Sequence, residues 1–107
     1  MHKEDDMRKI INGKMYNTET AEQVATWTNG HYSDFNFCCE TLYRKRTGEY
    51  FIHGEGGAAS KYAESVDMNC WASGSSIKPI TKDAARKWME TYAEVDEYIA
   101  EFGEPEE

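Results

Sequence analysis

Residues 37–53 constrain the fold more than any other part of the sequence, because they predict a β-hairpin in the middle of the chain. Two runs rich in aromatic, thiol and threonine side chains favour strands, and Thr47-Gly48 separates them. A two-residue loop at this position would pair Tyr43 with Ile52. In that register one face of the hairpin carries Cys39, Tyr43, Tyr50 and Ile52, and the other carries Cys38, Leu42, Arg44, Phe51 and His53.

A second hairpin is predicted close to the N-terminus, where Asn12-Gly13 lies between two short apolar runs. Both central positions of a tight hairpin turn require a positive φ, which Asn and Gly tolerate better than other residues. Residues 1–7 precede this hairpin and are rich in charge. We expect them to form a flexible N-terminal extension, and they lack the apolar core of a signal peptide.

Two further segments have a composition typical of helices. Residues 19–28 are predicted to form the first helix, because Thr20 and Gln23 have the spacing of a capping box. Residues 58–65 are predicted to form the second, directly after a glycine-rich sequence. Residues 66–75 are expected to be irregular.

The C-terminal region predicts a long helix that begins after Thr81 and ends at Gly103, with Asp96 as a second N-cap if the helix is broken. Its apolar residues recur every three or four positions and are expected to face the core: Trp88, Tyr92, Val95, Ile99 and Phe102. Acidic residues repeat this spacing two positions later, on the opposite side: Glu90, Glu94, Glu97, Glu101 and Glu104. On a continuous helix these acids oppose the macrodipole and repel one another, which indicates a functional role. A solvated acidic face is the alternative.

Residues 76–80 are predicted to form a short strand at a sheet edge, because Pro79 has no N–H to donate to a neighbouring strand. The sequence thus predicts an α+β fold, a small antiparallel sheet built from hairpins with helices packed on one face. A chain of 107 residues suits a single domain. We place this domain at residues 8–107, ending in the acidic helix.

The sequence HGEGG, which begins at His53, has the glycine content of a phosphate-binding loop. It lacks the Gly-Lys-Ser/Thr of such loops and follows an antiparallel hairpin, whereas nucleotide loops usually follow a parallel strand. We expect Gly54, Gly56 and Gly57 to form a structural loop in which at least one glycine has a positive φ. The alternative is an enzyme in which His53 and Glu55 act as a general acid/base couple.

The three cysteines, Cys38, Cys39 and Cys70, indicate reduced thiols in a cytoplasmic protein. An odd number without a Cys-x-x-Cys pair is a poor disulfide framework and gives no recognisable zinc spacing, so neither a metal nor another cofactor is expected. Cys38 and His53 lie too far apart along the predicted hairpin to form a nucleophilic pair. No catalytic residue is therefore assigned.

The net charge of −8 is concentrated at the C-terminal end of the chain. Residues 90–107 contain eight of the 20 acidic side chains and none of the 12 basic ones, so residues 1–89 hold 12 of each sign. Such an acidic end repels phosphates, which argues against direct binding of nucleic acid. The sequence also has no apolar run long enough for a membrane span.

Three stretches of the sequence resemble a group of small, mostly uncharacterised accessory proteins that phages and conjugative elements of Gram-positive bacteria carry. They are IINGKMYNTETAE at residues 10–22, SDFNFCCETLYRKRTGEYFIHGEGGAASKYAE at residues 33–64 and DEYIAEFGEPEE at residues 96–107. The resemblance covers nearly the whole chain from Met7. Accessory genes of this kind include anti-CRISPR inhibitors, so the resemblance implies a role against a host defence system and brings no catalytic residues with it.

Together with the acidic end of the chain, the resemblance implies a non-enzymatic acidic binding protein of a mobile genetic element. It would inhibit a host nucleic-acid-targeting defence nuclease, such as a CRISPR effector, by occupying a basic surface with its acidic side chains. Two alternatives stay open. One is a small cytosolic enzyme centred on His53, Glu55 and the Gly54–Gly57 loop, and the other is an interaction domain that associates with itself.

Overall fold

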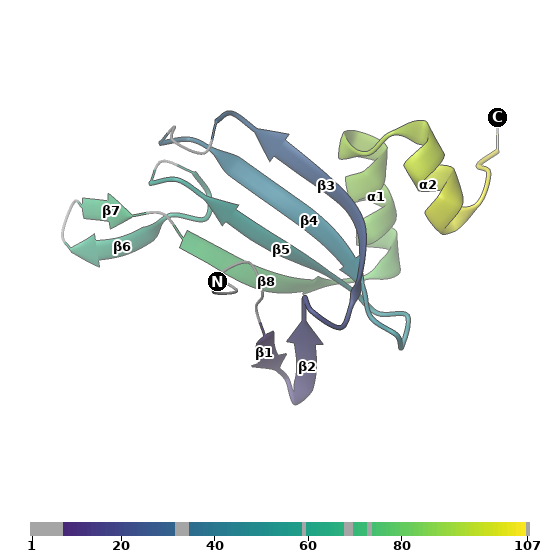
Figure 1. The fold of residues 1–107 in the computed structure, drawn as a ribbon, viewed down its shortest axis with the longest axis horizontal. Coiled ribbons are helices and arrows are strands. Elements are labelled where there is room, and N and C mark those ends of the chain that lie inside the picture. The colour runs from purple at the N-terminus through teal and green to yellow at the C-terminus, as the bar shows by residue number, and fades with distance from the viewer. Residues whose placement is uncertain (1–7, 32–34, 59, 68–69, 73, 107) are drawn as a thin grey trace.

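A four-stranded antiparallel sheet with the order β3-β4-β5-β8 forms the centre of the fold (Figure 1). The structure is a computed structural model, and it describes residues 8–31, 35–58, 60–67, 70–72 and 74–106. The four strands are β3 (Glu22–Asn29), β4 (Cys38–Arg44), β5 (Tyr50–Gly56) and β8 (Gly74–Ile80). The extension expected at residues 1–7 lies outside the described residues.

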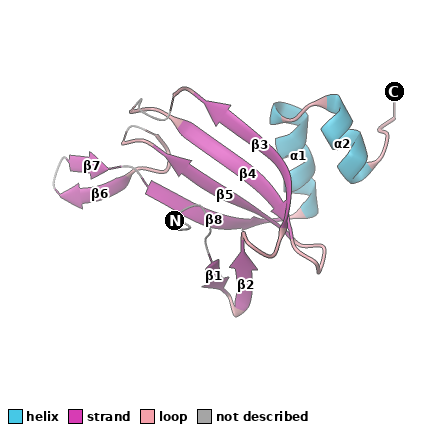
Figure 2. Ribbon diagram, viewed as in Figure 1, coloured by secondary structure: helices cyan, strands magenta, loops and turns pink. Residues whose placement is uncertain are grey.

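Two small hairpins and two helices complete the described chain. The hairpins are β1 (Arg8–Ile11) with β2 (Lys14–Asn17), and β6 (Glu64–Asp67) with β7 (Cys70–Ala72). The helices are α1 (Lys82–Tyr92) and α2 (Val95–Phe102). Figure 2 shows both helices near one end of the sheet and the β6–β7 hairpin near the other end. The predicted α+β fold with an antiparallel sheet is confirmed. Within the described part of the chain, no helix has the length and apolar character that crossing a membrane requires.

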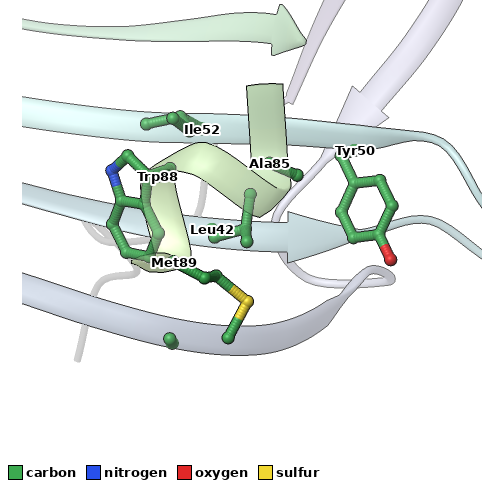
Figure 3. Close-up of a cluster of buried hydrophobic side chains, with 7 residues drawn as sticks. Leu42, Tyr50, Ile52, Ala85, Trp88 and Met89 are labelled. Atoms are coloured by element: carbon green, nitrogen blue, oxygen red, sulfur yellow. The ribbon is translucent and has the colours of Figure 1, made fainter. Parts of the chain in front are cut away.

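The two faces of the sheet bury separate apolar clusters. On one face, side chains of β4 and β5 pack against α1 (Figure 3): Leu42, Tyr50, Ile52, Ala85, Trp88 and Met89. On the other face, Phe51 and Ile77 pack with Tyr16 of the β1–β2 hairpin. The tight turn of that hairpin is the predicted one, because Asn12 and Gly13 both have a positive φ, of 52° and 78°. The sheet is therefore covered by a helix on one face and, at one end, by a hairpin on the other.

The β4–β5 hairpin forms as predicted, but its predicted register is wrong by one residue. Leu42 pairs with Ile52, and Tyr43 pairs with Phe51 rather than with Ile52. The loop contains three residues instead of two, closed by a hydrogen bond from the Lys45 N–H to the carbonyl of Glu49. Its last residue, Gly48, has a φ of 94°. A shift of one residue moves side chains to the opposite face, so the predicted faces are wrong as well.

The helix predicted at residues 19–28 is wrong, because this segment forms strand β3 and pairs with β4. The β-branched Val24, Thr26 and Thr28 favour a strand, and burial alternates around Ala25 as it does on a half-buried strand. The side chain of Asn17 accepts a hydrogen bond from the N–H of Glu19, which closes a turn before the strand.

The helix predicted at residues 58–65 is also wrong. Successive turns follow β5, with hydrogen bonds from Ser60 N–H to the Gly57 carbonyl and from Ala63 N–H to the Ser60 carbonyl. The chain then enters β6 at Glu64. Parts of the segment expected to be irregular, residues 66–75, belong to strands β6, β7 and β8. The short edge strand predicted at residues 76–80 is confirmed as part of β8, with Pro79 at the sheet edge.

The C-terminal helix is two helices rather than one. Thr81 caps α1 through a hydrogen bond from the Ala84 N–H, and Gly103 ends α2 with a φ of 85°, both as predicted. Ala93 and Glu94 are extended and separate the helices. The second N-cap is Glu94, not Asp96, because the break comes two residues earlier than the expected cap.

Candidate functional site

A groove of about 330 Å³ lies between α1 and α2. Its lining mixes apolar and acidic side chains: Met89, Glu90, Ala93, Glu94, Val95, Tyr98, Ile99 and Pro105. The extended residues Ala93 and Glu94 create it, because they turn α2 back beside the end of α1. A continuous helix, as expected from the sequence, would not produce a groove at this position.

Glu94 and Glu97 fix the start of α2. The side chain of Glu97 accepts a 3.0 Å hydrogen bond from the N–H of Glu94, and the side chain of Glu94 accepts from the N–H of Glu97. This reciprocal capping box satisfies two backbone donors, and Asp96 adds negative charge to the same turn. These acids therefore lie at a helix N-terminus, where the macrodipole favours them, and not at the C-terminus of one long helix. The predicted conflict with the macrodipole is wrong for them.

Glu101 points into the protein and not toward a partner. Its carboxylate accepts hydrogen bonds of 2.5 Å from Arg44 Nη1 and 2.5 Å from the Tyr50 hydroxyl, and its side chain is 8% exposed. Burial and the bond to Glu101 raise the pKa of Tyr50 to about 12, so the phenol remains a donor. Arg44 also pairs with Glu22 on β3. The expectation that Glu101 belongs to an exposed acidic row is thus wrong, because this residue anchors α2 to the sheet.

Six exposed acids gather around the groove. Each is a lining residue or the neighbour of one, and none forms an ion pair within the described part of the chain: Glu90, Glu94, Asp96, Glu97, Glu104 and Glu106. We call these six residues the acidic rim. Val95 lies among them with 73% of its surface exposed, although the helical pattern predicted that it would face the core. The site therefore combines carboxylates that form no ion pair with another described residue and an accessible apolar lining.

A second groove, of about 410 Å³, borders the tip of the β4–β5 hairpin. Arg44, Lys45 and Arg46 line it, but acids of the protein already neutralise two of the three cations. Arg44 pairs with two glutamates, and Lys45 Nζ lies 3.0 Å from a carboxylate oxygen of Glu49. Hydrogen bonds from Lys14 and Lys45 lower the pKa of Glu49 to about 2, so this pairing persists over the usual pH range. Of the two grooves, the α1–α2 groove is therefore the one whose charged lining residues form no ion pair with another described residue.

Gly54 and Gly56 of the HGEGG sequence are structural, but not for the predicted reason. Gly54 and Gly56 lie inside β5, and none of Gly54, Gly56 and Gly57 has a positive φ. A Cβ on Gly54 would lie 1.9 Å from Cζ of Tyr62, and one on Gly56 would lie 2.1 Å from Oγ of Ser60. The glycines are needed because side chains of the following segment lie directly against the strand.

A buried carboxylate, Glu40 on β4, was not singled out by its sequence context. Its side chain is 3% exposed and accepts hydrogen bonds from Lys61 Nζ at 2.7 Å, the Tyr62 hydroxyl at 2.5 Å and Trp88 Nε1 at 2.9 Å. Burial alone would raise the pKa of Glu40, but bonds from Lys61, Tyr62 and Trp88 outweigh it and hold the pKa below its usual value. Both oxygens are engaged, so this network joins α1 and the Ser60–Ala63 segment to the sheet. The sequence signal for its burial is its spacing, because Glu40 lies two positions from both Cys38 and Leu42 and therefore shares their face of the strand.

The residues of the enzymatic alternatives do not come together as a Cys–His pair. Cys38 pairs with Gly56 and shares the α1 side of the sheet, whereas His53 pairs with Thr41 on the opposite side. Burial, followed by the nearby charge of Glu40, raises the pKa of Cys38, which disfavours the thiolate. His53 and Glu55 are two positions apart on β5, so both side chains lie on the face away from α1. His53 is buried.

Comparison with known proteins gives no residue assignment for this site. No family model matches the sequence, and neither the curated proteins nor the solved structures give a match. Over the residues that the structure describes, no three His, Cys, Asp or Glu side chains are grouped so that they could hold a metal ion. The α1–α2 groove and its acidic rim are therefore the features from which we infer a function.

Proposed function

We propose that this chain is a non-enzymatic binding protein that docks its acidic rim on a basic surface of a partner protein. The observation that carries the proposal is the concentration of the six rim carboxylates around one groove, where none of them forms an ion pair with another described residue. Basic side chains of a partner would supply the ion pairs that these carboxylates lack within the described ranges. A partner with a strong positive field would also be attracted from a distance.

The partner class that fits this charge is a nucleic-acid-binding protein. The channels of such proteins carry Lys and Arg that neutralise phosphates, and an array of carboxylates can compete for the same cations. The resemblance of the sequence to accessory proteins of mobile genetic elements points to a CRISPR effector nuclease as the first partner to test. Binding there would block access of nucleic acid and so inhibit the nuclease.

The framework behind the rim favours binding without large rearrangement. The ion pair between Glu101 and Arg44 and the hydrogen bond from Tyr50 hold α2 against the sheet. The rings of Tyr50 and Phe102 lie 5.8 Å apart and add an apolar contact to the same joint. A site that is already ordered loses less conformational entropy on binding.

A cleavage assay tests the proposal. A purified, guide-loaded CRISPR effector from a Gram-positive bacterium is incubated with increasing amounts of the protein before target DNA is added. We expect stoichiometric inhibition by the wild type, and on the order of tenfold weaker inhibition by Glu90→Gln/Glu94→Gln, because the attraction to a basic channel falls.

The matched control is Glu19→Gln/Asp83→Asn, which removes the same charge from exposed positions outside the rim. This control should inhibit as the wild type does. Equal losses in the two double variants would show that only net charge matters, and absence of inhibition across effectors of several types would refute the proposed target.

A further inference from the structure

We infer that the α1–α2 groove is the anchor site for a partner segment that carries an apolar side chain flanked by Arg or Lys. The inference rests on the proposed function and specifies the chemistry of the partner. The volume of the groove, about 330 Å³, lies within the range of sites that hold a small ligand or a few side chains. Carboxylates alone would need no such hollow to attract a basic surface.

The lining of the groove is suited to an apolar occupant. Met89 lines the groove and is 1% exposed, whereas Val95 at the start of α2 is 73% exposed. Tyr98 and Ile99 also line the groove and are half-buried, so their exposure is between that of Met89 and that of Val95. An apolar side chain in the groove would cover Val95 and remove this surface from water.

The charges beside the lining determine what must flank that apolar side chain. Glu90 on α1 and Glu94 at the start of α2 both line the groove and are exposed. Neither has an ion-pair partner in the described ranges. A neutral apolar peptide would bring no cation to these carboxylates, and an acidic one would be repelled. Charge complementarity therefore selects Arg or Lys next to the apolar anchor.

A second copy of this chain fits the groove less well. Each copy carries a net charge of −8, so two copies repel each other at long range. Of the three cations at the tip of the β4–β5 hairpin, Arg44 and Lys45 are already paired with acids of their own chain. The structure thus favours a different, basic partner.

Two labelled peptides separate the apolar anchor from the flanking charge. One carries a leucine between arginines, and the other has serine in place of leucine and the same charge. We expect the wild type to bind the leucine peptide more tightly. Val95→Ser should lower the affinity for the leucine peptide roughly fivefold and leave the affinity for the serine peptide unchanged. Val95 is exposed, so this variant should retain the fold, which circular dichroism checks.

Failure of this inference can be distinguished from failure of the proposed function. Equal binding of both peptides, unaffected by Val95→Ser but weakened by Glu90→Gln/Glu94→Gln, would overturn the anchor and support docking by charge. Leucine-dependent binding that is insensitive to salt and to those two glutamates would contradict the proposed function. Self-association that Val95→Ser abolishes in sedimentation experiments would place a second copy in the groove and overturn the inference.

Discussion

Gly54 is required because Tyr62 occupies the space that a side chain at this position would need. The hydroxyl of Tyr62 reaches Glu40 across the strand, so the ring passes directly over the glycine. A sequence does not distinguish a glycine that is needed for close approach of a neighbouring side chain from one that is needed for a positive φ. The sequence therefore predicted a structural role for Gly54 and Gly56, but it could not indicate the cause.

Gly54→Ala should lower the free energy of unfolding by about 2 kcal/mol or more, because the new methyl group overlaps the Tyr62 ring. Urea denaturation measures this change. Tyr62→Ala creates the missing space, so the double variant Gly54→Ala/Tyr62→Ala should be more stable than the sum of the two single effects predicts. Additive effects would show that the ring does not lie over Gly54.

Glu40 should make the free energy of unfolding depend on pH in the acid range. Its pKa is lowered in the folded state, so the folded protein binds fewer protons than the unfolded chain as the pH passes through this range. The contribution is fully present above the ordinary carboxyl pKa of 4.5 and is lost as the pH falls through the lower folded value. Glu40→Gln should cost about 2 kcal/mol at pH 7, because the buried amide has only one oxygen and cannot accept from both Tyr62 and Trp88 as the two carboxylate oxygens do.

Denaturation of the wild type and Glu40→Gln from pH 3 to pH 7 checks this assignment. The difference between the two proteins should shrink as the pH falls, since the wild-type carboxylate becomes protonated. Glu49→Gln is a useful comparison, because Glu49 also has a lowered pKa but lies at an exposed hairpin. A difference for Glu40→Gln that is constant with pH would contradict the account.

At the level of secondary structure, the correct predictions are those that depend on the local chemistry of one or two residues. The turn at Asn12-Gly13, the cap at Thr81 and the stop at Gly103 each depend on one or two residues, and all three are present. The segment of β3 is different, because its strand conformation depends on pairing with β4. A distant partner overrode the local helix signal of residues 19–28.

The groove depends on the break between α1 and α2, and the sequence left a break near Glu94–Asp96 open without indicating how the two helices would pack. The apolar and acidic spacing of residues 88–104 continues through this break, so the pattern indicates one helix. Four of the five predicted acids remain exposed, but Glu101 is turned inward by Arg44 and Tyr50 of the sheet. Those contacts join residues more than 50 positions apart and leave no local signal.

Glu101 should stabilise the attachment of α2 to the sheet. Glu101→Gln should lower the free energy of unfolding by about 1–2 kcal/mol, because it removes a shielded ion pair with Arg44. The matched variant Glu104→Gln lies beyond the end of α2 and should change stability by less than about 0.5 kcal/mol. Thermal denaturation and amide exchange of α2 measure both, and equal effects would show that Glu101 is not an anchor.

Over the whole molecule, paired and unpaired charges lie on different surfaces. The hairpin tips near the helices carry cations that pair with nearby acids, namely Lys14 and Lys45 with Glu49 and Arg44 with Glu101, whereas the acidic rim has no ion-pair partner among the described residues. The molecule measures 48 Å along its longest axis, several times the screening length of ~8 Å at physiological ionic strength. A partner approaching the helices therefore responds mainly to the rim and not to the average charge of the chain.

The association rate with a guide-loaded CRISPR effector, measured by stopped flow as a function of salt, tests the central claim most directly. The wild-type rate should fall steeply as salt rises, because screening removes the attraction between the rim and a basic channel. Glu90→Gln/Glu94→Gln should associate on the order of tenfold more slowly at low salt and show a shallower salt dependence, whereas Glu19→Gln/Asp83→Asn should match the wild type. A rate that does not change with salt, or that is the same in the rim variant and the wild type, would contradict docking through the acidic rim.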